Sequence, residues 1–536
     1  MKSNVSSANT RGPVVLVSRE IGFTFPLSYA YLAGHLKSCG EDVRILFRRS
    51  AASSFDDLVR DILALKPVLV GFGNLYPELE DIRSIIADLD ASGRNFPVVI
   101  GGQMVSPIPE FAVTVTGADV GVIGEGEIVL HQVVTALREG RDVAEVGGLA
   151  IRQGDSVILT GLGEYFQDLS DLPPVPYELF PTDQWLPVGR WYAEHIIQPH
   201  WRYRDRVVNV HGGRGCPYRC NFCYHHSKPR YRALPQMMAE AAEGLKRFDA
   251  TMLYFSDDLA VCNPRRAEQL ACEIAALDRP VDFSVSARFD ILDRMSDELL
   301  QELSDRGCRV MGLGIESGSD RMLKIIGKNC TSEVVLKGLQ RLRRVGIIPT
   351  VSIMVGQDSE TRDDVEASIS LMRESVRDNP NIFYTFTIAT PFPGSSLYDL
   401  AFEKGLLTSH REFYDMFFPP QGQAKGLDRL LVNFSAMSDQ GVFDAHRDIS
   451  LAYREAKAGS ENRTATRLGR LQLNVGRAHR ILVDPVRRRL PSSGPLAGLG
   501  KAYDALYGHT HVALERARLK RLGLLVSPGT DGVSSP

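Results

Sequence analysis

Three cysteines lie close together in the run Cys216-Pro217-Tyr218-Arg219-Cys220-Asn221-Phe222-Cys223. Thiolates hold iron–sulfur clusters in proteins, and the C-x3-C-x2-C spacing lets three of them bind three irons of one 4Fe-4S cluster. The fourth iron would then stay open to a ligand from outside the chain. The spacing therefore predicts a cluster that takes part in chemistry rather than one that only stores electrons.

The alternative for the same cysteines is a structural zinc loop. Zinc sites of that kind take four protein ligands, often as two separated pairs, and only His225 and His226 stand nearby as further ligands. The other five cysteines are scattered singly through apolar or helical patterns, as expected of small buried side chains. Both observations favour the cluster, with Cys216, Cys220 and Cys223 as its ligands.

The composition indicates an intracellular enzyme of several domains. The chain has 536 residues, 44% of them hydrophobic, which is enough for two to four domains with cores of their own. Eight cysteines in so long a chain do not make a disulfide framework. The first residues carry no apolar signal core, and no apolar stretch approaches the roughly 20 residues that span a bilayer. We therefore expect a cytoplasmic protein without a membrane span.

The elements ahead of the cysteines alternate regularly. Short β-branched strands are predicted near residues 14–17, 43–47, 68–72, 98–100 and 120–123, with helical segments between them. This pattern predicts a doubly wound, Rossmann-like α/β domain over residues 1–145. Ligands bind at the carboxyl ends of such strands, and the glycines that follow these strands let a large ligand approach the backbone.

A connector and a second alternating region follow. Residues 146–200 are expected to be a linker, because the proline-rich run at 172–176 cannot form a regular helix. Trp185, Trp191 and Trp201 stand at its end, where they either pack between the domains or line the cavity between them. In residues 201–405, strands near 207–210, 252–255, 281–285, 310–315, 350–355 and 382–388 alternate with amphipathic helices. They predict a partial (β/α)6 barrel of the TIM type, with its chemistry at the carboxyl ends of the strands.

These motifs together resemble the radical SAM family that carries a cobalamin-binding domain, which includes the class B radical SAM methyltransferases. The cysteine run looks like the signature in which S-adenosylmethionine (SAM) chelates the open iron. The glycine-bearing strand ends look like the cobalamin-binding domain that precedes it. Further landmarks are Phe255-Ser256-Asp257-Asp258, Gly314-Ile315-Glu316-Ser317-Gly318, Met354-Val355-Gly356 and Thr390-Pro391-Phe392-Pro393-Gly394-Ser395, so the resemblance covers residues 13 to about 405.

The resemblance implies two sets of binding residues. Those for cobalamin are Gly73, Asn74, Gly101, Gly102, Gln103, Gly124, Glu125 and Gly126. Those for SAM are Phe222, Asp258, Ser286, Arg288 and Glu316. In such a set, a protein carboxylate can bind the ammonium group of SAM, a guanidinium can bind its carboxylate, and a hydroxyl can bind its ribose. For each residue of the SAM set, a solvated loop or an ion pair such as Arg288 with Asp290 is the alternative.

This sequence departs from the family pattern in two places. Gln357-Asp358 stands where the family usually has leucine or a similar residue and then proline, which should alter only a loop. The Asp-x-His-x-x-Gly loop that supplies a histidine to cobalt in many cobalamin proteins is missing after the first strand. Radical SAM members commonly lack it, so cobalamin without a histidine ligand is expected, and a domain that binds no cobalamin is the alternative.

Residues 406–536 are expected to form a variable α-helical region that closes the substrate cavity. Between 451 and 526 there are fifteen Lys or Arg against five Asp or Glu, densest at Arg487 to Arg489. Such a surface favours a phosphate-bearing or carrier-attached substrate, or nucleic acid, and a solvated helical face is the alternative. The tail from Ser527 is polar and is expected to be disordered.

The implied function is methylation of an unactivated carbon of a small-molecule biosynthetic intermediate, through a 5′-deoxyadenosyl radical and methylcobalamin. The cofactors would be a 4Fe-4S cluster, SAM and cobalamin, with an electron donor such as flavodoxin or ferredoxin as partner and nucleic acid disfavoured. A cobalamin-dependent cyclase or rearrangement enzyme without methyl transfer is the alternative. A sulfur-inserting enzyme would need a second group of cysteines, and a sensor would not need polar strand ends.

Overall fold

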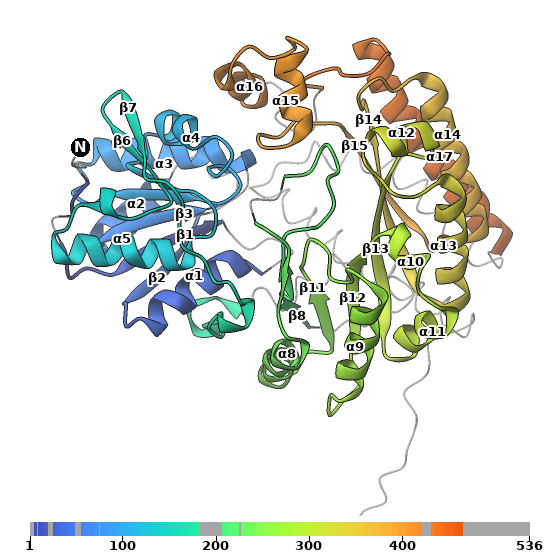
Figure 1. Cartoon of the computed structure of the whole chain (residues 1–536), viewed down its shortest axis with the longest axis horizontal. Helices are drawn as coiled ribbons and strands as arrows, with labels where there is room; N and C mark the ends of the chain where they lie inside the picture. The colour runs from blue at the N-terminus through green and yellow to red at the C-terminus, as the bar shows by residue number, and fades with distance from the viewer. Residues whose placement is uncertain are drawn as a thin grey trace, which may run out of the picture.

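The computed structural model describes residues 5–7, 9–19, 25–48, 55–73, 76–182, 206–224, 227–419 and 430–464, of which Arg19 and residues 460–464 by their backbone alone. Two large sheets flanked by helices organise this part of the chain, and Figure 1 shows them on opposite sides of the molecule. The expectations for Trp185, Trp191 and Trp201, for Arg487 to Arg489 and for the tail lie outside the described residues.

The N-terminal sheet has the strand order β2-β1-β3-β4-β5-β6-β7. Its strands are β1 (Val14–Arg19), β2 (Val43–Arg48), β3 (Leu69–Gly73), β4 (Val98–Gly101), β5 (Val120–Val122), β6 (Leu149–Gln153) and β7 (Ser156–Leu159). The first five are parallel, as predicted, whereas β6 and β7 add to β5 as an antiparallel hairpin. This hairpin occupies part of the expected linker at 146–200. The sequence pattern did not reveal it, because its two strands are joined by a two-residue turn at 154–155 and no helix separates them.

Helices cover both faces of this sheet, which confirms the doubly wound prediction. The helices are α1 (Leu27–Ser38), α2 (Asp56–Leu65), α3 (Leu79–Ala91), α4 (Pro109–Thr116) and α5 (Glu127–Glu139). Alternate residues of a strand point to opposite faces, so Val14 and Leu16 join a core with α1 and α5. Val15 and Val17 join the core that contains α2, α3 and α4.

The second sheet has six parallel strands in the order β15-β14-β13-β12-β11-β8, and all six were predicted. They are β8 (Val207–Val210), β11 (Met252–Phe255), β12 (Asp282–Ala287), β13 (Cys308–Glu316), β14 (Ile348–Val355) and β15 (Phe383–Ile388). Helices α8 (Leu234–Phe248), α9 (Pro264–Ala275), α11 (Asp297–Asp305), α13 (Ser332–Val345) and α14 (Arg362–Asp378) share its core. Strands β8 and β15 do not pair with each other, so the barrel is open, as predicted.

Shorter elements position the loops between these strands. A two-stranded ribbon of β9 (Gly213–Arg214) and β10 (Arg230–Tyr231) brackets the cysteine run. The short helices α10 (Phe289–Leu292) and α12 (Asp320–Ile325) follow β12 and β13. The ribbon was not predicted, since two-residue strands carry no readable periodicity.

The described C-terminal region contains α15 (Ser396–Glu403), α16 (His410–Phe417) and α17 (Asp439–Thr464). Phe413 and Phe417 of α16 pack on Tyr76, with ring centroids 5.4 and 5.2 Å away, inside the core that contains α2, α3 and α4. Tyr453 of α17 packs on Tyr384 of β15. Helices α15 and α16 therefore pack against the N-terminal unit, and α17 packs against the second sheet. The described part of the region does not line the cavity discussed below. The expectation that residues 406–536 close the substrate cavity stays a prediction, since much of that region lies outside the described residues.

Candidate functional site

The cysteine run forms a loop, here called the cysteine loop (216–223), whose backbone is held by neighbouring elements. The Asn221 N–H donates to the carbonyl of Ile326 at the end of α12, and the Leu397 N–H at the start of α15 donates to the Asn221 carbonyl. Gly327, at φ +78°, lies so close that an added Cβ would be 2.9 Å from the Arg219 carbonyl oxygen. The loop is thus fitted against helices that follow β13 and β15.

The three thiols suit a polynuclear cluster better than a single zinc ion. All three cysteines are free. Among the described residues, their sulfur atoms are not part of any group of three ligand atoms within 4.8 Å of one another. Tetrahedral zinc with Zn–S bonds of about 2.3 Å would hold the sulfurs about 3.8 Å apart. Burial raises the pKa of the Cys216 thiol, and a bound metal centre would stabilise the thiolate instead.

Arg288 lies against the cysteine loop and keeps one donor unused. Its Nη1 contacts the Cys220 sulfur at 3.4 Å, and its guanidinium lies 3.6 Å from the centre of the Tyr218 ring. Its Nε donates to Asp290 at 2.9 Å, so the ion pair considered from the sequence does form. Its Nη2 is buried and has no partner among the described residues. An unpaired buried donor is costly, and it is the group that an anionic ligand would satisfy.

Glu316 ends β13 in an unusual backbone conformation. Its φ is +69°, and the pairing of β13 with β14 shifts register beside it. Holding a non-glycine residue there costs about 1 to 3 kcal/mol and is typical of functional sites. The buried carboxylate accepts hydrogen bonds from the Ser352 hydroxyl at 3.0 and 3.1 Å and from Lys328 Nζ at 3.3 Å. It therefore already lies in a site built for a cationic partner.

A cavity of about 1060 Å³ joins the carboxyl ends of the two sheets. On the N-terminal side it is lined by every predicted cobalamin residue that the structure describes: Gly73, Gly101, Gly102, Gln103, Gly124, Glu125 and Gly126. Asn74 lies outside the described residues. On the other side it is lined by Asp258 and Ser286 of the predicted SAM set. Phe222 is part of the cysteine loop and Arg288 contacts that loop, and neither these two residues nor Glu316 line the cavity.

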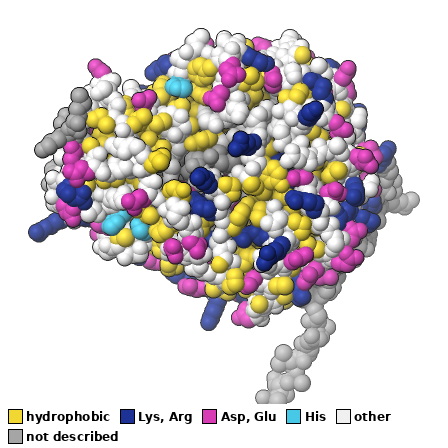
Figure 2. Space-filling model, in the orientation of Figure 1, with side chains coloured by type: hydrophobic (Ala, Val, Ile, Leu, Met, Phe, Trp, Pro, Cys, Tyr) yellow, Lys and Arg dark blue, Asp and Glu magenta, His cyan; other side chains and the backbone are white. Residues whose placement is uncertain are grey.

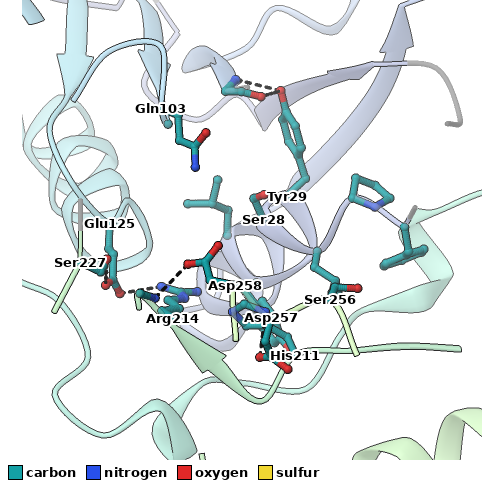
Figure 3. Close-up of a pocket in the computed structure, with 18 of the residues that line it drawn as sticks. Ser28, Tyr29, Gln103, Glu125, His211, Arg214, Ser227, Ser256, Asp257 and Asp258 are labelled. Carbon is teal, nitrogen blue, oxygen red and sulfur yellow. Dashed lines mark hydrogen bonds and ion pairs between the residues drawn. The ribbon is translucent and has the colours of Figure 1, made fainter. Parts of the chain in front are cut away.

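Glycine has a clear steric role at this edge. Gly102 and Gly124 both have φ +84°, a conformation that other residues rarely adopt. A Cβ on Gly124 would meet nothing within 4 Å, so the space above it is open to a ligand. In Figure 3 the side chain of Gln103 extends into the same space, between the two sheets.

Three residues of this cavity were missed by the sequence analysis. Tyr29 of α1, drawn in Figure 3, accepts a hydrogen bond from the Gly73 N–H at 2.8 Å. It also donates a hydrogen bond to the Val17 carbonyl at 2.8 Å, so it links β1 to β3. His211 follows β8, and burial lowers its pKa to about 3, so that it is neutral. Arg214 lies in the ribbon. No local motif marks Tyr29 or His211, whereas Arg214 stands two residues before the first cysteine of the motif and could have been considered.

Arg214 links the two units through buried ion pairs. Its guanidinium contacts Glu125 Oε2 at 2.6 Å, on the loop that follows β5, and Glu127 Oε1 at 2.5 Å, at the start of α5. Glu125 also accepts hydrogen bonds from Arg230 and from the Ser227 hydroxyl. Although Glu127 is buried, Arg214 holds its pKa below the usual value. This network, partly visible in Figure 3, fixes the ribbon around the cysteine loop against the N-terminal sheet.

Asp257, from the Phe255-Ser256-Asp257-Asp258 motif, is buried at the cavity edge. Its carboxylate accepts hydrogen bonds from the N–H groups of Gly212 and Gly213, and burial raises its pKa to about 7. Asp258 accepts from the Gly215 N–H at 3.1 Å, at the start of the cysteine loop. The motif therefore supports the loop's backbone as well as lining the cavity.

Comparisons with known proteins agree with this layout. Residues 14–134 match the B12 binding domain, and residues 210–372 match the radical SAM superfamily. An uncharacterized methyltransferase of Pyrococcus horikoshii is 26% identical over 397 residues, which are 73% of this chain and 82% of that protein. The anaerobic magnesium-protoporphyrin IX monomethyl ester cyclase of Rubrivivax gelatinosus is 26% identical over 430 residues, 77% and 74% of the two chains.

A solved structure shows the same fold. It is the radical S-adenosylmethionine methyltransferase TsrM from Kitasatospora setae with cobalamin and a 4Fe-4S cluster bound. It is similar with a TM-score of 0.60 at 20% identity, over 74% of this chain and 80% of that chain.

The two matched domains contain the two sheets that border the cavity. A radical SAM domain uses a 4Fe-4S cluster and SAM, and a B12 binding domain uses cobalamin, so the protein is an enzyme with these three cofactors. The family and the cofactors predicted from the cysteine and glycine motifs are confirmed. The chain belongs to the radical SAM family whose members carry a cobalamin-binding domain ahead of the radical SAM domain.

Proposed function

We propose that the protein is a methyltransferase that methylates an unactivated carbon of a small-molecule biosynthetic intermediate. The observation that carries this proposal is the cavity that opens onto both domains. When bound, the cluster and SAM supply a hydrogen-abstracting radical, and cobalamin supplies a methyl group. A substrate carbon in a shared cavity could meet both without leaving the protein. The similarity to an uncharacterized methyltransferase supports the same assignment.

Residues around the cysteine loop would orient SAM. Cys216, Cys220 and Cys223 would hold the cluster, and the unpaired Nη2 of Arg288 would donate to the carboxylate of SAM. Glu316 would accept the ammonium group, which exchanges for its present contact with Lys328. Asp258 and Ser286 line the cavity, where they could accept from and donate to the ribose hydroxyls. Phe222, whose ring lies 5.7 Å from Lys328 Nζ, would pack beside this end of the ligand.

The cobalamin side would be formed by backbone rather than by a metal ligand. The glycines at the ends of β3, β4 and β5 leave open space, and Gln103 and Glu125 supply the polar groups. Among the described residues that line the cavity, His211 is the one histidine, and it lies on the second unit 3.8 Å from Asp257. We therefore propose that cobalt has no protein imidazole ligand. Paramagnetic resonance of the cobalt(II) form should show no nitrogen splitting from an imidazole, and finding such splitting would contradict this.

The products of SAM separate methyl transfer from the alternative chemistry. The anaerobically reconstituted enzyme should be incubated with SAM, a one-electron reductant and cobalamin, and both nucleoside products should be quantified. A methyltransferase should form S-adenosylhomocysteine only when cobalamin is present. With a candidate substrate, a deuterated SAM methyl group should appear in the product. The Cys220→Ala variant should lose the cluster absorbance and form no 5′-deoxyadenosine, and a variant that kept about four irons per chain would refute the cysteine assignment.

The second candidate is a cobalamin-dependent cyclase or rearrangement enzyme, favoured by the similarity to the Rubrivivax cyclase. It should give 5′-deoxyadenosine without S-adenosylhomocysteine.

For either chemistry we propose an external electron donor such as flavodoxin or ferredoxin. None of the described helices is both long and apolar enough to cross a membrane. On the face in Figure 2, the described acidic and basic side chains are intermixed, which gives no continuous basic track for nucleic acid.

A further inference from the structure

Two imidazoles and one thiol gather on the face of the N-terminal sheet that α1 and α5 cover. His35 and Cys39 come from the end of α1, and His131 comes from α5. One ligand atom of each lies within 4.8 Å of the other two, and no other group of three His, Cys, Asp or Glu side chains among the described residues is so close. The cluster lies outside the cavity, and none of its members lines that space.

The geometry is close to that of a tetrahedral zinc site. Residues four apart share one face of a helix, so His35 and Cys39 point the same way, and His131 meets them from the neighbouring helix. The Cys39 sulfur lies 3.8 Å from Nε2 of His35. Zinc with bonds of about 2.3 Å to sulfur and about 2.0 Å to nitrogen would bring these two atoms to about 3.6 Å. The required adjustment is a small rotation of side chains.

The surroundings also favour a cation. The site adjoins the carboxyl end of the 12-residue helix α1, where the helix dipole is negative. The Glu127 carboxylate, one turn before His131 on α5, also acts electrostatically on His35. The ring of Phe166 packs edge-on against His35 at 5.3 Å and shields one side of the site. Cys39 is exposed, so an ion and a water ligand can enter from solvent.

We propose that His35, Cys39 and His131 bind one zinc ion, with water as the fourth ligand. Binding releases the Cys39 thiol proton to solvent and forms one Zn–S and two Zn–N bonds. The ion would tie the end of α1 to α5. Helix α1 reaches the cavity at its other end through Tyr29, and α5 reaches it through Glu127, one turn before His131. The metal would therefore fix the two helices to each other on the face of the cobalamin domain that they cover.

Alkylation of exposed thiols tests the site within one protein sample. The full-length enzyme, with its cluster reconstituted, should be treated anaerobically with iodoacetamide before and after one equivalent of zinc. Peptide mass spectrometry should show Cys39 modified at least tenfold more slowly with zinc. Cys272 on α9 is also exposed and serves as the internal control, because its alkylation rate should not change with zinc. An unchanged rate at Cys39, or equal slowing at both cysteines, would overturn the proposal.

Variants and X-ray absorption then identify the ligands. His35→Ala/His131→Ala leaves Cys39 in place and should abolish its protection by zinc, whereas Cys272→Ser should retain it. Zinc edge spectra of the wild type should fit one sulfur at about 2.3 Å and two nitrogens at about 2.0 Å. Protection that persists in the double variant, or a first shell of oxygen only, would refute the site. Far-UV circular dichroism and an unchanged Cys272 rate show that the double variant is folded.

Discussion

Replacing Arg214 by methionine should destabilise the enzyme by about 3 to 5 kcal/mol at pH 7, because Glu127 then becomes an unpaired buried charge. Glu127 is 5% exposed, and Arg214 is its ion-pair partner in the described structure. At a charge separation of about 4 Å and an effective dielectric constant of about 20, that pair contributes about 4 kcal/mol of Coulomb energy. Glu125 should suffer less, because it keeps Arg230 and Ser227.

The pH dependence identifies the cause. In the wild type the folded-state pKa of Glu127 is lowered, so its stabilising contribution is present above its unfolded pKa and is lost as the pH falls through the folded value. Without Arg214, burial alone should raise that pKa above its unfolded value. Protonation then relieves the buried charge, and the deficit of the variant relative to the wild type should shrink between pH 7 and pH 5.

Urea unfolding of cluster-loaded protein, measured anaerobically at both pH values, gives the magnitude. The double variant Arg214→Met/Glu127→Gln should recover much of the loss, because it removes the uncompensated charge. Arg141→Met is the matched control, since Arg141 is 45% exposed in its pairs with Glu139 and Glu145, and exposed ion pairs contribute little to stability. An Arg214→Met loss no larger than that of the control, or no recovery in the double variant, would refute the reasoning.

Three further changes address other parts of the site. Glu316→Gln should weaken SAM binding about 10- to 100-fold in calorimetry, because it removes a charge-assisted hydrogen bond of about 1.5 to 3 kcal/mol. The cluster spectrum should stay unchanged, and an unchanged affinity for SAM would show that Glu316 does not bind it. Gly101→Ala should largely keep cobalamin loading, because an added Cβ meets only ordinary contacts, 3.7 Å from Val122. Gly101→Leu should sharply reduce loading, because its longer side chain reaches into the cavity. Equal loading of the two variants would contradict the assignment of the β4 end to the cobalamin site. Burial raises the pKa of Asp257 to about 7, so the folded state retains a proton that the unfolded state loses between about pH 4 and pH 7, and stability falls as the pH rises through that range. Asp257→Asn should flatten that slope in urea unfolding, and parallel curves would contradict the assignment.

Much of the fold could be predicted from the sequence because its signals are local. Each strand of the two parallel regions is a short apolar run followed by a helical period, and the six strands from β8 to β15 were all located in this way. The edge strands β6 and β7 carry no helix between them, and β9 and β10 are two residues long, so none of them produced such a pattern. Helix α16 lies in the region that was predicted to be helical, but its partner Tyr76 lies over 300 residues earlier in the chain, so their contact could not be read from the sequence.

Part of the candidate site could likewise be predicted from local sequence signals, and part could not. Cys216, Cys220 and Cys223 lie in one loop because of their spacing in the sequence. The glycines mark strand ends where the absence of a side chain leaves room for a ligand. The sequence by itself therefore determined the family, the cofactors and the order of the domains. Only the tertiary structure showed that Arg214 pairs with Glu125 and Glu127 and that His131 meets His35 and Cys39. It also showed that one donor of Arg288 has no partner among the residues that the structure describes. Periodicity and spacing describe neighbours along the chain, whereas these contacts join segments that only the packing of sheets and helices brings together.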